Sequence, residues 1–115
     1  MPELHELINT DYADVLQEPA FRLTIDTHQR FFLTAGNFEV HVVDDHDAYK
    51  YRFDLNGYLM AKNVPPSLHY TTMRINGMTS IREFSYPKFK ALMLPSQEAF
   101  RQVVQHYRTT IGTAL

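Results

Sequence analysis

The chain has 115 residues, 44% of them hydrophobic, with eight Phe, seven Tyr and a formal net charge of −2. This length and composition predict one domain with a buried core and argue against a disordered chain. The chain has no cysteine and no apolar run near the ~20 residues of a bilayer span, which excludes disulfides, zinc–thiolate clusters, thiol nucleophiles and a membrane-spanning helix.

Residues 3–16 predict an amphipathic helix, because apolar residues recur there at helical spacing opposite Glu and Asp side chains. Pro19 is expected to end this helix, since proline has no amide hydrogen and disfavours helix in the residue before it. No basic segment precedes an apolar one here, so we expect no secretory signal.

The next part of the chain predicts strands, because apolar and polar residues alternate with a period of two. The apolar positions of the three runs are Phe21, Leu23 and Ile25, then Phe38, Val40 and Val42, then Tyr49, Tyr51 and Phe53. Gly36-Asn37 is typical of a tight hairpin turn, and the acidic run over residues 44–47 indicates a second turn. The expected result is an antiparallel meander of three or four strands.

Residues 54–77 admit two interpretations. Asn56-Gly57 and Asn76-Gly77 each match a hairpin turn, which would make this region β. The alternative is two short helices, the first capped by Asp54, the second capped by Ser67 and ended by Asn76-Gly77. One face of that second helix would carry Leu68, Thr72 and Ile75. Intrinsic propensity does not decide between the two interpretations.

The last segment predicts a helix with one apolar face. Ser96 is a good N-cap residue, and Glu98 in the first turn suits the positive end of the helix dipole. The apolar stripe contains Phe100, Val103, Val104, Tyr107 and Ile111. This face is expected to pack on the chain's own core or on a neighbouring protein.

Residues 49–95 carry a recognisable order of segments. These are YRFD for a first strand, LNGYLMAKN for a first helix, PPSLHYTTMRINGMTS for a second helix and its turn, and FKALMLPS for a last strand. The second-helix motif consists of Pro66, Leu68, His69, Tyr70, Asn76 and Gly77. This order resembles the LysM module, and the motif more closely resembles the LysM-like phage baseplate wedge proteins. The resemblance favours the two-helix interpretation.

The resulting prediction is an α+β fold, with a small antiparallel sheet, a LysM-like strand-helix-helix-strand unit and helices at both termini. The chain is expected to be a single domain over residues 1–115. Residues 1–48 would hold the N-terminal helix and antiparallel strands, residues 49–95 the LysM-like unit, and residues 96–115 the C-terminal helix.

Motifs that carry chemistry are scarce. The densest group of metal-ligand types consists of His41, Asp44, Asp45, His46 and Asp47. A strand residue followed by a flexible turn is poorly organised for metal binding, so a solvated acidic turn is expected, with no metal and no cofactor. The chain has no Gly-x-Ser-x-Gly, no phosphate-binding glycine loop and no His-Glu-x-x-His motif.

The carboxylates of Asp26, Glu39 and Asp54 would be candidates for general acid and general base catalysis if they faced one cleft. Their alternation with apolar residues instead favours an exposed sheet face. We therefore expect a protein that is not an enzyme.

Lys and Arg alternate with Tyr and Phe over residues 49–90, as in proteins that bind single-stranded nucleic acid. The sequence pI of about 6.3 and the acidic N-terminal half oppose that function. LysM resemblance also implies binding of N-acetylglucosamine polymers such as peptidoglycan. The Gly-Asp-Thr type motif of those binders is replaced here by Phe53-Asp54-Leu55, which favours the protein-binding branch.

The expected function is therefore that of a structural virion protein in a phage tail baseplate, made in the host cytoplasm and bound to other tail subunits. Residues 1–47 sum to a charge of −8 and residues 48–115 to +6, so self-association through unlike halves is a further possibility. The alternatives are a peptidoglycan-binding module and a small phage or bacterial inhibitor acting by protein binding. The candidate interface residues are Tyr58, Leu68, Tyr70, Met73, Phe100 and Tyr107.

Overall fold

The structure is a computed structural model that describes residues 15–114, with side chains up to residue 110. Its first elements are helices α3 (Pro19–Thr27) and α4 (Gln29–Phe32), strand β1 (Phe38–Val42), and helices α5 (Asp45–Lys50) and α6 (Leu55–Ala61). They are followed by the 3-10 helix η1 (Pro66–Leu68), α7 (His69–Ile75), the 3-10 helix η2 (Ile81–Glu83), strand β2 (Ala91–Pro95) and the long helix α8 (Gln97–Ala114). The predicted α+β class is confirmed.

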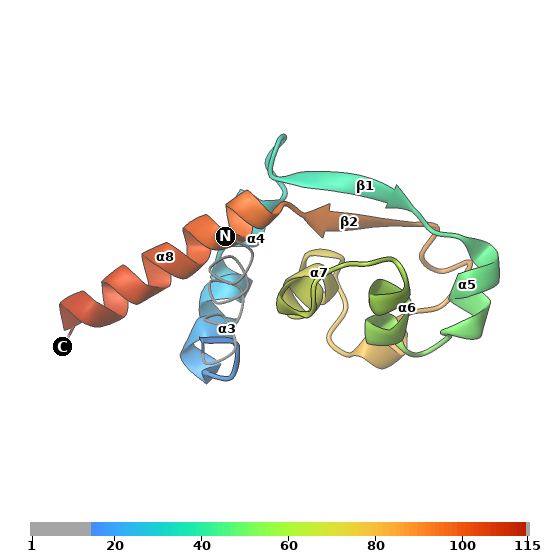
Figure 1. Ribbon diagram of the computed structural model, residues 1–115, viewed down its shortest axis with the longest axis horizontal. Coiled ribbons are helices and arrows are strands. Elements are labelled where there is room, and N and C mark those ends of the chain that lie inside the picture. The colour runs from blue at the N-terminus through green and yellow to red at the C-terminus, as the bar shows by residue number, and fades with distance from the viewer. Residues whose placement is uncertain (1–14, 115) are drawn as a thin grey trace, which may run out of the picture.

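The sheet of the described residues has two antiparallel strands, with Phe38 opposite Pro95 and Val42 opposite Ala91. Figure 1 shows β2 between β1 and the pair of helices α6 and α7. The strand-helix-helix-strand order is therefore present, but its first strand is β1 and α5 is inserted after it. The strand predicted over residues 49–53 and the meander of three or four strands are wrong.

The run Phe21, Leu23, Ile25 forms helix α3 and not a strand. Phe21 and Ile25 are fully buried, whereas Leu23 is 64% exposed, so only the pair four residues apart faces the core. Pro19 is the first residue of α3, a position where the missing amide hydrogen costs no hydrogen bond. The predicted helix end before Pro19 is also present, because residues 15 and 16 are helical, residue 17 is in a turn and Glu18 is extended. The helix predicted over residues 3–16 lies almost entirely outside the described residues.

Neither of the two predicted turns in residues 36–47 joins a hairpin. Gly36, at φ +92°, lies between α4 and β1, and the partner of β1 is β2. The acidic run begins helix α5, where the Asp44 carboxylate accepts a hydrogen bond from the His46 amide at 3.1 Å. Asp45 and Asp47 occupy its first turn, where negative charge is favourable.

The two-helix interpretation of residues 54–77 is confirmed. Asp54 caps α6 by accepting from the Gly57 amide at 3.0 Å. A Cβ on Gly57 would lie 2.4 Å from an Asp54 carboxylate oxygen, which explains glycine inside this helix. Gly77, at φ +81°, follows α7 and allows the chain to leave the helix. Ser67 does not cap α7, because it lies within η1 and the α7 cap has no side-chain hydrogen bond.

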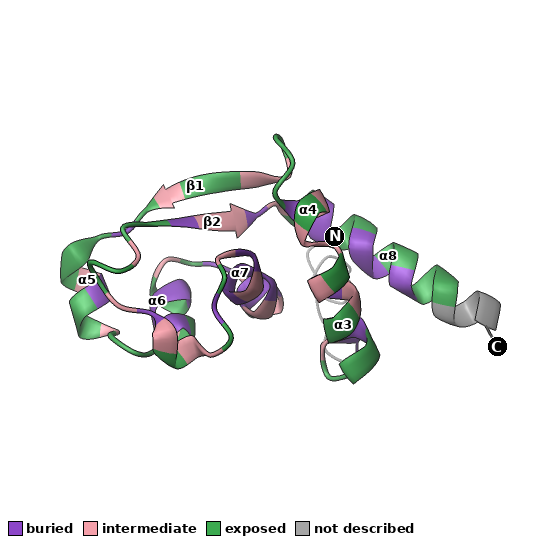
Figure 2. Cartoon of the chain, turned by 180° about the vertical axis from the view of Figure 1, so that it is seen from behind, coloured by how far each residue is buried: buried purple, intermediate pink, exposed green. Residues whose placement is uncertain are grey.

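The C-terminal helix forms as predicted. The Ser96 hydroxyl accepts from the Ala99 amide at 3.0 Å, and the stripe from Phe100 to Tyr107 is buried. Phe21 of α3 packs edge to face on Phe100 and on Tyr107, with ring centroids 6.0 and 5.2 Å apart. One hydrophobic cluster includes residues of α3, the sheet, α6, α7 and α8. Figure 2 shows buried residues along α7 and α8 and mostly exposed residues along β1.

Candidate protein-interaction surface

The predicted interface residues lie mainly in the core. Their exposed fractions are 0% for Tyr58, 4% for Leu68, 8% for Met73, 1% for Phe100 and 6% for Tyr107. These five side chains pack inside the chain, so they offer almost no surface to a partner in this conformation. Tyr70 alone among the six is partly exposed. Helical periodicity identified apolar positions correctly but does not distinguish a chain's own core from an interface.

Tyr70 belongs to a polar link between α3 and α7. Its hydroxyl donates to Asp26 at 3.3 Å, and Arg74 Nε donates to the same carboxylate at 2.9 Å. The Arg22 guanidinium lies over the Tyr70 ring, 5.3 Å from its centroid. Burial, together with the negative charge of Asp26, raises the pKa of Tyr70. Tyr70 therefore holds two helices together within the chain.

The three carboxylates considered as catalytic candidates lie in separate places. Asp26 pairs with Arg74, Asp54 caps α6, and Glu39 is exposed on β1. None of these environments brings two of the three carboxylates together.

The histidines and aspartates near α5 have internal partners. The Tyr58 hydroxyl accepts from the Asp44 amide at 3.1 Å and lies 2.7 Å from His41 Nε2, so its own hydrogen is available to a neutral His41. Burial, followed by the charge of Lys62, lowers the pKa of His41. Lys62 pairs with Asp47 at 2.6 Å, and this hydrogen bond lowers the pKa of Asp47.

Within residues 15–110, no three or more His, Asp or Glu side chains are grouped so that they could hold a metal ion. His41 faces Tyr58, whereas His46 is exposed on α5, so the two predicted ligands have different surroundings.

A cluster of exposed aromatic and basic side chains lies around α5. We call Tyr49, Arg52, Phe53 and Tyr86 the aromatic patch. Tyr49 is 69% exposed, Phe53 56% and Tyr86 40%. The Arg52 guanidinium lies over both neighbouring rings, 4.9 Å from the Tyr49 centroid and 5.3 Å from the Phe53 centroid. Figure 1 places α5 at the end of the sheet opposite α8.

Phe53 has a strained backbone in addition to its exposed ring. Its φ of +66° is in the left-handed region, which costs a non-glycine residue on the order of 1 kcal/mol or more. The turn is fixed by the Phe53 amide, which donates to the Phe84 carbonyl at 2.8 Å, and by the Asp54 amide, which donates to the Tyr51 carbonyl at 2.9 Å. The fold thus holds a large apolar ring in water at a strained position, a combination that its own core does not explain.

Sequence reasoning missed the aromatic patch because it assigned residues 49–53 to a strand with Tyr49, Tyr51 and Phe53 on its buried side. A short-range sequence pattern could have indicated the patch. Arg52 stands three residues after Tyr49 and directly before Phe53, a spacing that lets one guanidinium cover two rings in a helix followed by a turn.

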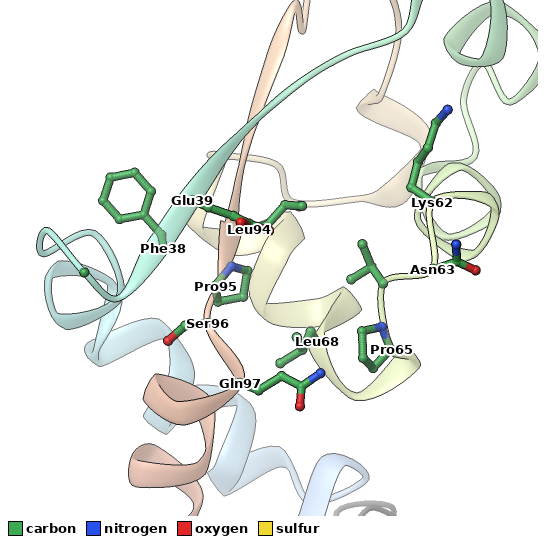
Figure 3. A pocket seen from close by; sticks show the side chains of 12 residues that line it. Phe38, Glu39, Lys62, Asn63, Pro65, Leu68, Leu94, Pro95, Ser96 and Gln97 are labelled. Carbon is green, nitrogen blue, oxygen red and sulfur yellow. The ribbon is translucent and has the colours of Figure 1, made fainter.

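Two hollows accompany these surfaces. Tyr49 and Tyr86, with Asp45 and His46, line an open hollow with a volume of 350 Å³. A second hollow of 490 Å³ lies between the start of β1, η1 and the start of α8. Figure 3 shows Leu68, Pro65 and Gln97 around this second hollow. Leu68, a predicted interface residue, thus lines a hollow of the described surface.

Among the described residues, no helix combines the length and apolarity that crossing a membrane requires. Comparisons with protein-family models, with curated proteins and with solved structures found no match to this chain. The LysM-like resemblance over residues 49–95 therefore depends on the sequence motifs and on the order of the elements.

Proposed function

We propose that this chain is a non-enzymatic structural protein that binds neighbouring protein subunits, and that it serves as a LysM-like wedge component of a contractile phage tail baseplate. In this proposal the protein is made in the host cytoplasm and ends up in the virion. The aromatic patch is the observation that carries protein binding. The choice of assembly depends on the resemblance over residues 49–95.

The composition of the aromatic patch supports a protein partner. Tyr and Arg are enriched among the residues that dominate binding energy at protein interfaces, and aromatic side chains bury large areas on contact. Arg52 is already held over Tyr49 and Phe53, so it needs little further ordering on binding. A partner that covers these rings removes apolar surface from water, at roughly 25 cal/mol per Å².

The order of elements supports the LysM-like part of the proposal. Helices α6 and α7 lie between β1 and β2 in the chain, and Asn76-Gly77 follows the second of them. This is the arrangement that the resemblance implies for a wedge protein, although its first strand begins earlier in the sequence than the matched segment.

The first experiment follows the protein through a density gradient of particles purified from a lysate of its source. We expect it to migrate with intact tails at a fixed ratio to the other tail proteins. A protein that stays in the soluble fractions contradicts the baseplate assignment and favours the alternative of a small inhibitor that binds a host protein.

A second experiment tests the aromatic patch itself. Phe53→Ala removes an exposed ring without creating a cavity, so we expect unchanged unfolding and a loss of incorporation into particles of about tenfold or more. Leu23→Ala is the matched control, because Leu23 is 64% exposed but lies on α3, away from the patch. Equal incorporation of both variants contradicts the role of the patch.

The hollow beside Tyr49 favours a second candidate function. Two aromatic rings with an adjacent carboxylate and imidazole, those of Asp45 and His46, suit a sugar ring that stacks and forms hydrogen bonds. Co-sedimentation with purified peptidoglycan tests glycan binding. Tyr49→Ala should abolish that co-sedimentation, and protein that remains in the supernatant excludes this candidate.

A further inference from the structure

The sheet has one outer edge that the chain itself closes. The side chain of Asn76, at the end of α7, accepts from the Met93 amide at 2.8 Å and donates to the Met93 carbonyl at 2.9 Å. Asn76 thus pairs with β2 as a neighbouring strand would. Pro95, further along this edge, has no amide hydrogen to offer.

Among the described residues, no strand pairs with the outer edge of β1. The Val43 amide donates to the Lys90 carbonyl at 3.0 Å, and the Ser96 amide donates to the Asn37 carbonyl at 2.8 Å. In an antiparallel pair the bonds alternate, so the backbone groups of Phe38, Val40 and Val42 point away from β2. Among residues 15–114, no hydrogen bond reaches those outward groups. Three residues therefore offer three donors and three acceptors along one edge.

The side chains of β1 give this edge little protection. Val40 is 63% exposed and Val42 76% exposed, and the strand contains no proline and no lysine. Charged side chains, proline, bulges and covering segments are the usual means of preventing edge pairing, and β1 has a single carboxylate, that of Glu39. Figure 2 shows β1 at the margin of the molecule, with exposed residues along it.

We propose that β1 pairs with β1 of a second copy of this chain, antiparallel around a twofold axis at Val40, to form a four-stranded sheet. In this register the outward amides and carbonyls of Phe38, Val40 and Val42 pair with those of the second copy. Val40 lies opposite its own counterpart, and Phe38 lies opposite Val42 of the second copy. This pairing depends only on β1 and not on the function proposed above.

The polar side chains of β1 select this register. With the axis at Val40, Glu39 lies opposite His41 of the second copy, and His41 lies opposite Glu39 of the second copy. Moving the axis by one residue in either direction places Glu39 opposite Glu39 or His41 opposite His41. Two carboxylates directly opposite each other are unfavourable, and two neutral imidazoles gain no charged partner, whereas the N–H of a neutral His41 can donate to a carboxylate. Only the register at Val40 places the Glu39 carboxylate against the His41 imidazole at both positions.

Cross-linking with a single introduced cysteine tests the register, because the chain has no cysteine of its own. In the proposed pairing the two Cα atoms of residue 40 are about 5.5 Å apart, which a disulfide can span. Residue 42 and its counterpart are separated by about 14 Å along the strands. Under mild oxidation we expect a covalent dimer from Val40→Cys and none from Val42→Cys. Efficient cross-linking of Val42→Cys, or none of Val40→Cys, overturns the proposal.

Sedimentation velocity of the unmodified purified protein over a range of concentrations tests the dimer itself. We expect reversible dimers, and an increase of about tenfold or more in the dissociation constant for Val40→Lys, which places two ammonium groups opposite each other. Leu23→Lys is the matched control, with similar exposure on α3, and should dimerise like the parent. A monomer at every concentration, or equal dimerisation of Val40→Lys and the parent, overturns the proposal.

Discussion

The two strands of the sheet have the same length but opposite environments. In β2, Leu92 is fully buried, Pro95 is buried, and Asn76 occupies the outer edge. In β1, Val40 and Val42 are largely exposed, and no strand of the described part of the chain pairs with the outer edge. The difference shows that the core packs mainly against β2, whereas β1 contacts it through His41. Apolar residues of β1 remain available for contacts outside the chain.

The largest expected effect comes from truncating the buried strand. Leu92→Ala should lower the free energy of unfolding by about 2–5 kcal/mol, because it removes buried methyl groups and leaves a cavity. Val42→Ala on β1 is the comparison, and it should change the free energy by less than about 0.5 kcal/mol at concentrations where the protein is monomeric. Urea unfolding measures both. Equal losses would show that β1 belongs to the core as fully as β2.

A smaller effect is expected when the closed edge is opened. Asn76→Ala removes both hydrogen bonds to Met93 and the bond to the Thr72 carbonyl at 2.7 Å. We expect a loss of about 2–3 kcal/mol in urea unfolding, because partly buried backbone groups are left without partners. Asn56→Ala, at an exposed position of α6, serves as the control and should lie within about 0.5 kcal/mol of the parent.

The attachment of β1 is expected to depend on pH through His41. Its pKa is lowered in the folded chain, first by burial and then by Lys62, while Glu39 and Asp44 act in the opposite direction. The unfolded chain therefore binds more protons, so the stabilisation is complete well above the unfolded pKa of 6.5 and is lost as the pH falls through 6.5 toward the folded pKa.

Burial also lowers the pKa of His69 on α7, so both histidines weaken the fold in the same direction as the pH falls. His41→Gln separates the two contributions. We expect a smaller loss of stability between neutral and mildly acidic pH in this variant than in the parent, measured by thermal unfolding. An identical pH dependence would assign the effect to His69.

The smallest expected change in the free energy of unfolding comes from Phe53, the strained residue of the aromatic patch. Phe53→Gly relieves the positive φ of +66° and should raise the free energy of unfolding by up to about 1 kcal/mol. Tyr49→Gly, at the exposed helical position on α5, should lower it by about 1 kcal/mol, since glycine disfavours helix. A destabilised Phe53→Gly variant would mean that the ring contributes more packing than its 56% exposure indicates.

The elements that were predicted correctly from the sequence each have more than one local feature that indicates the same secondary structure. Helix α8 has a capping serine followed by an apolar stripe that fits only a helical period. The run Phe21, Leu23, Ile25 has only one local signal, and it is ambiguous. Phe21 and Ile25 are four residues apart and also fit one face of a helix, and this is the face that the structure buries. Three alternating positions are too few to separate the two periods.

The parts that could not be predicted depend on contacts distant in sequence. Strand β1 was predicted correctly as a strand, but its partner at Ala91–Pro95 cannot be read from the residues around it. The exposure of Tyr49 and Phe53 likewise follows from α5, which the acidic residues at its start initiate as a helix. The burial of five predicted interface residues could not be foreseen for the same reason, since Tyr58 and Phe100 are covered by elements from elsewhere in the chain.

The amide side chain of Asn76 has a consequence for polymerisation. It directs one donor and one acceptor at Met93 in the geometry of a peptide group, so a single residue takes the place of a third strand. Because Asn76 occupies the edge of β2, a further strand can pair with this sheet only at the edge of β1. Two copies joined at β1 would therefore expose only blocked edges, and the association would stop at a closed pair instead of continuing into a fibre.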